Sequence, residues 1–134
     1  MKYQFLCSNH GQQLQSSPGR ALSCYRDASE HGENLAFSGL HSEAIPYLGC
    51  AFESAEMLLE QMSLNVNHYA LCFTESAVML AKSLSLAGLE NECDEILNLC
   101  VQRLMKVKSL PREILSDCLL RIHSQVNKAL AVLH

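Results

Sequence analysis

The sequence lacks any run of basic residues, and its 14 acidic residues outnumber its 10 basic residues, which gives a net charge of -4 at pH 7. Because an acidic domain repels a phosphate backbone, nucleic acid is not an expected partner. The sequence also lacks an apolar run approaching the roughly 20 residues that a helix needs to span a bilayer, so no membrane partner is expected. Gln4, Ser8 and Asn9 interrupt the start before the apolar region of a secretory signal can form, which predicts a protein that is not secreted.

Motifs that carry enzymatic chemistry are missing as well. The sequence has no glycine-rich phosphate loop, no nucleophile elbow and no H-E-x-x-H motif. Glu53, Glu56 and Glu60 share one side of a predicted helix, but the Glu-x-x-His pair of a di-metal carboxylate bundle is absent. We interpret these carboxylates as a solvated helix face, and we expect a protein without catalytic activity and without a cofactor.

The sequence is rich in apolar residues that can form a hydrophobic core. Apolar residues make up 49% of its 134 residues and charged residues 18%, which fits one domain with one core. Its seven cysteines are an odd number, and most of them fall within helical patterns, where a free thiol serves as a small hydrophobe. The cysteines in helical patterns are Cys50, Cys72, Cys93, Cys100 and Cys118. Reduced cysteines favour a cytoplasmic protein.

Residues 38–62 form the element around which we expect the fold to be organised. Their apolar residues recur at steps of three, four and seven, which is the spacing of a broad apolar stripe on a helix. The stripe consists of Ala44, Ile45, Leu48, Ala51, Phe52, Ala55, Leu58, Leu59 and Met62. We therefore predict that this segment is the central helix of a bundle.

Start and end signals divide the rest of the chain. A serine cap before a proline predicts a helix at 18–37, and Gly39 and Gly88 predict helix ends. Further apolar stripes predict three more helices, at about 67–87, from just after Gly88 to about 108, and at about 111–132. The helix at 67–87 is apolar nearly all round, so we expect it to be the most buried.

Short connections between long helices make consecutive helices antiparallel neighbours. We therefore predict an all-α fold of about five antiparallel helices, stacked as helical hairpins in a single domain of residues 18–134. Residues 1–17 lack a helical stripe and are predicted to form a short extended or looped arm. Gly32 is expected where a neighbouring helix approaches closely, and Gly49 is expected to mark tight helix packing.

Two of the predicted hairpins carry small and large apolar residues at similar spacings. They are Gly32, Leu35, Gly39, Ala44, Leu48 and Ala51 in the first hairpin, and Leu80, Ala81, Leu84, Gly88, Cys93, Leu97 and Cys100 in the second. This pattern, over about residues 25–105, resembles the tetratricopeptide repeat. The chain departs from that family because Ala28 and Ala77 replace the early aromatic and the closing proline is absent. In addition, the two hairpins are offset by 49 residues rather than about 34.

The resemblance implies a protein-binding scaffold whose concave face is formed by the first helix of each hairpin. It nominates His31, Asn34, Tyr69 and Phe73 as residues that contact a partner. The alternative, from the residues themselves, is that Tyr69 and Phe73 belong to the core of a crowded helix.

Cys7 and His10 have the spacing of one zinc knuckle, since a thiolate and an imidazole so placed can reach the same ion. The sequence holds no second pair, so Cys24 or His31 from the first helix would have to supply a third ligand. Cys24 and His31 lie two turns apart, about 10 Å, so only one of them is expected to take part. The alternative is an arm that binds no metal. Cys7 and His10 also have the residue types of a nucleophile and its base, but they lack an evident orienting acid.

The function that these observations favour is a non-enzymatic, cytoplasmic protein–protein interaction module. It would act as an adaptor, a chaperone-like protein or a regulatory scaffold that binds a partner peptide or a second copy of itself as a homodimer. Leu130 and Leu133 of the last helix are expected to belong to an apolar patch that the partner covers. The alternative is a zinc-binding sensor or regulator that uses Cys7, His10 and Cys24.

Overall fold

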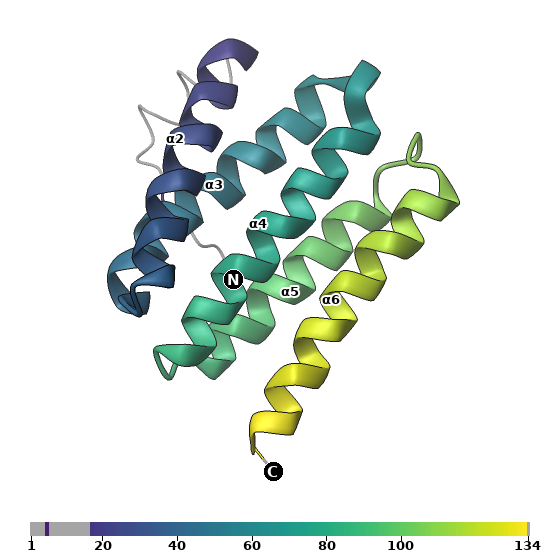
Figure 1. Ribbon diagram of the computed structural model, residues 1–134. Helices are drawn as coiled ribbons and strands as arrows, with labels where there is room; N and C mark the ends of the chain where they lie inside the picture. Colours follow the sequence, from purple (N-terminus) through teal and green to yellow (C-terminus); the bar gives the residue numbers. More distant parts are fainter. Residues whose placement is uncertain (1–4, 6–16, 134) are drawn as a thin grey trace.

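The computed structural model describes Phe5 and residues 17–133, with side chains described for Phe5, residues 17–62 and residues 64–126. This part of the chain forms five α-helices and one short 3-10 helix (Figure 1). The elements are α2 Pro18–Phe37, α3 His41–Gln61, η1 Ser63–Asn65, α4 Val66–Leu86, α5 Glu90–Met105 and α6 Arg112–Leu133. Consecutive helices pack together and alternate in direction, which confirms the predicted all-α fold of stacked hairpins.

The predicted arm of residues 1–17 lies outside the described residues, apart from Phe5 and Ser17. Among the described helices, none combines the length and the apolar character needed to cross a bilayer.

The bounds of α2 follow from local signals. Ser17 accepts the backbone N–H of Arg20 through its side-chain oxygen at 3.4 Å, and Pro18 occupies the start of the helix. The helix ends at Phe37, and Gly39 follows with a φ of 79°. Glycine adopts this left-handed conformation without the steric cost of a Cβ atom, so the chain can turn sharply there.

The turn between α4 and α5 repeats the turn between α2 and α3. Gly88 has a φ of 84°, and the N–H of Leu89 donates to the carbonyl of Leu84 at 2.8 Å. In the first turn, the N–H of Leu40 donates to the carbonyl of Leu35 at 2.9 Å in the same way. Both are Schellman helix ends, so the glycine stops predicted from the sequence are confirmed.

α4 is the most buried helix, as predicted, because α3, α5 and α6 all pack against it. Phe73 of α4 is fully buried and stacks on Phe52 of α3, with ring centroids 5.0 Å apart. The buried hydroxyls of Thr74 and Ser76 donate to backbone carbonyls of α4 itself, at 2.8 and 2.7 Å. These polar groups therefore enter the core with their hydrogen bonds made.

α5 is shorter than predicted. The sequence indicated a helix to about residue 108, but α5 ends at Met105. The N–H groups of Lys106 and Val107 donate to carbonyls three residues earlier, at 3.3 and 3.1 Å, which tightens the last turn and ends the helix. Lys106 and Lys108 consequently lie beyond the helix, in the connection to α6.

The carboxylates of α3 are only partly the solvated face that the sequence suggested. Arg103 of α5 reaches Glu60 at 2.7 Å and Glu56 at 3.6 Å, which joins α5 to α3. Burial raises the pKa of the Glu56 carboxyl above its ordinary value, and the Arg103 charge acts in the opposite direction. Glu53 accepts the backbone N–H of Phe5. The partly exposed ion pairs contribute about 0–1 kcal/mol each, so they orient α5 more than they stabilise it.

Gly32 lies where α2 and α3 cross, as predicted. A Cβ atom at this position would lie 2.7 Å from Cδ2 of Leu48 and 3.1 Å from its backbone nitrogen. Gly49 is also tightly packed, but the prediction named the wrong neighbour. A Cβ atom there would overlap the ring of Phe5, so the glycine accommodates a residue from the amino-terminal arm rather than another helix.

We expect Gly32→Val to destabilise the fold by about 1–3 kcal/mol, because the new side chain overpacks a site closed by the buried Leu48. The control is Gly19→Ala, since Gly19 lies in the first turn of the same helix, where a Cβ atom would make only an ordinary contact, at 3.9 Å from Oγ of Ser17. Urea unfolding followed by circular dichroism gives both free energies. A Gly32→Val variant as stable as the control would contradict the close approach of α2 and α3.

Candidate functional site

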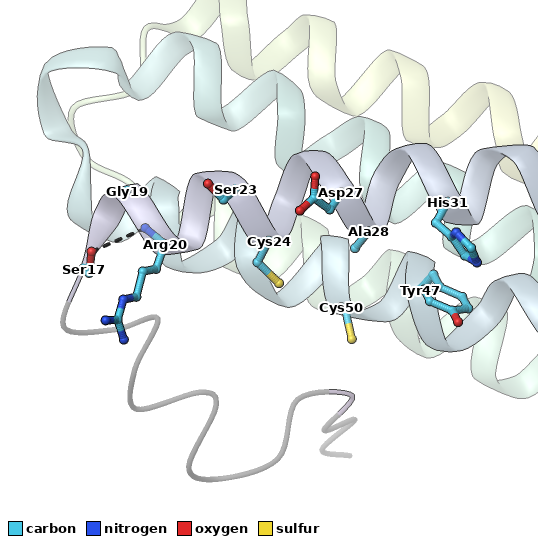
Figure 2. Close-up of a pocket in the computed structure, with 10 residues that line it drawn as sticks. All are labelled: Ser17, Gly19, Arg20, Ser23, Cys24, Asp27, Ala28, His31, Tyr47 and Cys50. Atoms are coloured by element: carbon cyan, nitrogen blue, oxygen red, sulfur yellow. Dashed lines mark hydrogen bonds between the residues drawn. The ribbon is translucent and has the colours of Figure 1, made fainter.

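A hollow of about 900 Å³ lies along α2 and the adjoining part of α3 (Figure 2). Its lining includes Cys24 and His31, two of the candidate residues identified from the sequence. The His31 ring contacts the ring of Tyr47 from α3, with centroids 4.2 Å apart. His31 and Asn34 are both exposed on α2, so both remain available to a partner.

The polar groups of this hollow do not converge on one point. Figure 2 shows the Cys24 and Cys50 sulfurs on one side of α2, while Ser23 and Asp27 point to the opposite side. The Cys24 sulfur accepts a hydrogen bond from the buried hydroxyl of Ser54 at 3.3 Å. A small-molecule site needs a few polar groups aimed at the same place, and this arrangement does not supply them.

Phe5 packs on α3 beside this hollow. Its ring covers Gly49, its N–H donates to the Glu53 carboxylate, and its carbonyl accepts the thiol hydrogen of Cys50 at 3.7 Å. Burial raises the pKa of the Cys50 thiol to about 11, with the charges of Cys24 and Glu53 acting in the same direction. Cys50 is therefore a neutral thiol at pH 7 rather than a nucleophile.

The thiols of the other packed helices are equally unreactive. Burial raises the pKa of Cys93 to about 11 and that of Cys100 to about 12. Burial also raises the pKa of Cys72 and Cys118. Metal binding and nucleophilic attack both need the thiolate. Cys93, Cys100 and Cys118 are buried and serve as core side chains, as the helical pattern suggested, whereas Cys72 is only half-buried.

The structure also contains a cysteine–histidine pair that was not predicted from the sequence. The Cys72 sulfur lies 3.6 Å from Nε2 of His68, one turn earlier on α4. The spacing of four residues could have identified it, because such residues share a helix face. Burial raises the pKa of Cys72, however, and its bond with Tyr25 only partly opposes that effect. The pair thus lacks the low thiol pKa that activates a catalytic cysteine.

The zinc hypothesis depends on residues that the structure does not describe. Cys7 and His10 lie outside the described residues. Cys24 is half-buried in the wall of the hollow. Among the described residues, no group of three or more metal-binding side chains comes together. Zinc binding by Cys7, His10 and Cys24 therefore stays a prediction.

Two of the residues nominated by the repeat resemblance lie in the core. Tyr69 and Phe73 are both buried on α4, which confirms the alternative interpretation and removes them from any surface that a partner could contact. The repeat resemblance misled the assignment, because it placed this helix on a concave surface, whereas α3, α5 and α6 all pack against it. The side chains of Leu130 and Leu133 lie outside the described residues, so their part in an apolar patch stays a prediction.

Large apolar side chains are instead exposed at the two matching turns. We define the paired-turn surface as the set Phe37, Leu40, Leu86 and Leu89. The exposed fraction is 89% for Phe37 and 57% for Leu86. Figure 1 places the α2–α3 and α4–α5 turns at the same end of the molecule. His41 at the start of α3 lies 3.1 Å from the hydroxyl of Ser83 near the end of α4, which holds the two turns side by side.

The sequence contained a signal for this surface. Each capping glycine is preceded by an apolar residue two positions earlier and followed directly by leucine, and the two sets are offset by the same 49 residues. In a Schellman end, the residue after the glycine packs back onto the helix, so apolar residues there are usual. Their exposure could not be inferred, because it depends on what the other helices cover.

Searches for similar proteins returned no matching family, no matching curated protein and no matching solved structure. The resemblance to the tetratricopeptide repeat is therefore supported only at the level of five helices that pack in sequence order.

We expect Gly49→Ala to displace Phe5 from α3 and to expose the thiol of Cys50. Its pKa would then fall from about 11 toward the ordinary 9.0, which raises the thiolate fraction at pH 8 by up to about 100-fold. Alkylation with iodoacetamide at pH 8, mapped by peptide mass spectrometry, measures the rate at each cysteine. The buried Cys100 is the internal control and should not change. An unaltered rate at Cys50 would show that Phe5 does not protect it.

Proposed function

We propose that this protein is a non-enzymatic protein–protein interaction module that docks on its partner through the paired-turn surface. The observation that carries the proposal is the exposure of Phe37, Leu40, Leu86 and Leu89 at one end of a well-packed bundle. Single exposed apolar residues are common on soluble proteins, but a group of large ones on neighbouring turns is typical of an interaction site.

The energetics favour docking at this surface. Full burial of one phenylalanine or leucine side chain stabilises a complex by about 1.5–3 kcal/mol. Aromatic anchors surrounded by smaller apolar contacts carry much of the binding energy in known interfaces. The two Schellman turns fix the backbone on which these side chains stand, so a partner does not have to order it.

The remaining features support binding rather than chemistry. The hollow beside α2 does not bring its polar groups together, and burial raises the pKa of the Cys50 and Cys100 thiols, which keeps both protonated at pH 7. An adaptor, a chaperone-like protein or a regulatory scaffold in the cytoplasm would need no more than a stable bundle with a docking surface. The resemblance to the tetratricopeptide repeat supports the same class of function, although the surface proposed here lies at the turns rather than on a concave face.

We expect the double variant Phe37→Ser and Leu86→Ser to weaken partner binding roughly 100-fold, because two anchors of about 1.5 kcal/mol each are lost. The parent protein and the double variant would each be immobilised and exposed to a lysate of the cells that make the protein, and the captured proteins would be compared. Both residues are largely exposed, so the circular dichroism spectrum and Tm should stay close to those of the parent protein.

The matched control is Leu120→Ser, since Leu120 lies on α6 and is exposed to a similar degree, 66% against 57% for Leu86. It should retain every captured protein. Equal capture by the double variant and the control would contradict the proposal.

A further inference from the structure

Acidic side chains gather around the paired-turn surface. Glu43 lies in the first turn of α3, and Glu90 and Glu92 lie in the first turn of α5. The positive end of the helix dipole favours carboxylates there. Because helices alternate in direction, α3 and α5 both begin at this end (Figure 1). The two first turns that contain the three carboxylates therefore lie at the same end of the bundle. Lys82, near the end of α4, is the basic residue closest in sequence to Glu90 and Glu92.

The opposite end of the bundle carries the complementary pattern. It contains η1 and the connection from α5 to α6, which Figure 1 places away from the paired turns. Near this end, the Arg103–Glu60 ion pair joins α5 to α3. We define the basic-end surface by its exposed residues Leu64, Met105, Lys106, Lys108 and Arg112.

The apolar members of the basic-end surface are Leu64, 97% exposed, and Met105, 61% exposed. Among the described residues, Lys106, Lys108 and Arg112 form no salt bridge, and Glu113 is the carboxylate next to them. The molecule is thus bipolar, with apolar side chains among carboxylates at one end and apolar side chains among cations at the other.

We propose that the partner of the paired-turn surface is the basic-end surface of a second copy of this chain. This inference rests on the proposed function, since it names the occupant of the docking surface proposed there. In such a contact, apolar residues meet apolar residues at the centre while Glu43 and Glu90 of one copy face Lys106 and Lys108 of the next. Complementary charges of this kind steer the approach and fix the orientation.

The charges also decide against a symmetric contact. Two paired-turn surfaces facing each other would bring Glu43 and Glu90 against their own copies, and like charges across an interface are unfavourable. A head-to-tail contact avoids this repulsion. It also leaves one paired-turn surface and one basic-end surface free, so assembly continues beyond a dimer into a chain or closes into a ring.

The test exchanges the charges of the two ends. One variant carries Glu43→Lys and Glu90→Lys, which makes both of its ends basic, and the other carries Lys106→Glu and Lys108→Glu, which makes both of its ends acidic. Sedimentation velocity at low ionic strength gives the mass in solution. We expect the parent protein to pass beyond a dimer as concentration rises, while each variant alone stays at the 14.9 kDa of one chain, its association weakened at least tenfold.

An equimolar mixture of the two variants should restore assembly, because each basic end then meets an acidic end. A general effect of net charge or of misfolding cannot produce this restoration. The matched control carries Glu30→Lys and Asp117→Lys, which changes the net charge as much as the first variant but on the sides of α2 and α6. It should assemble like the parent protein.

A parent protein that stays monomeric, one that stops at a dimer, or a mixture that fails to assemble would each overturn the head-to-tail contact. If the parent protein is monomeric and the Phe37→Ser and Leu86→Ser variant still loses its captured proteins, the paired-turn surface binds another protein. The proposed function then stands and only this inference fails. If the parent protein is monomeric and that variant retains every captured protein, both the proposed function and this inference fail.

Discussion

Burial of α4 is the constraint on which the rest of the structure depends. This helix is apolar on nearly every side, so α3, α5 and α6 must cover it before the chain is stable. Buried polar side chains of α4 form hydrogen bonds with the helix itself or with a neighbouring helix. The Thr74 hydroxyl, for example, donates to the carbonyl of Ala70. α2 contacts α4 only slightly and packs mainly on α3, which leaves the outer face of α2 and the hollow beside it open.

The two glycine turns place acidic residues at one end of the molecule and basic residues at the other. Gly39 and Gly88 reverse the chain over very few residues, so α3 and α5 begin together and run in the same direction. Carboxylates that the helix dipole favours at each beginning therefore accumulate at one end. The cations that follow α5 come to the other end for the same reason. The charge separation is thus a consequence of the topology and not of any single residue.

Most of the fold could be predicted from local sequence signals, whereas contacts between residues far apart in the chain could not. The cap at Ser17 and the stops at Gly39 and Gly88 depend on neighbouring residues alone, and each was found from the sequence. The ring of Phe5 on Gly49 joins residues far apart in the chain, so the glycine was noticed but its neighbour was not. The candidate site was harder still, because exposure of the paired-turn surface depends on what every other helix covers.

The cysteine thiols and the apolar side chains at the two turns differ in burial, and this difference decides what each can do. Around the cysteines it removes water that would stabilise a thiolate, so the pKa of Cys50 rises and the side chain becomes part of the packing. Phe37 and Leu86 are the last residues of α2 and α4, and the described chain leaves both side chains largely exposed. The buried thiols therefore belong to the packing, while Phe37 and Leu86 remain exposed at one end of the molecule. The proposed function would use these exposed side chains as contacts with another protein.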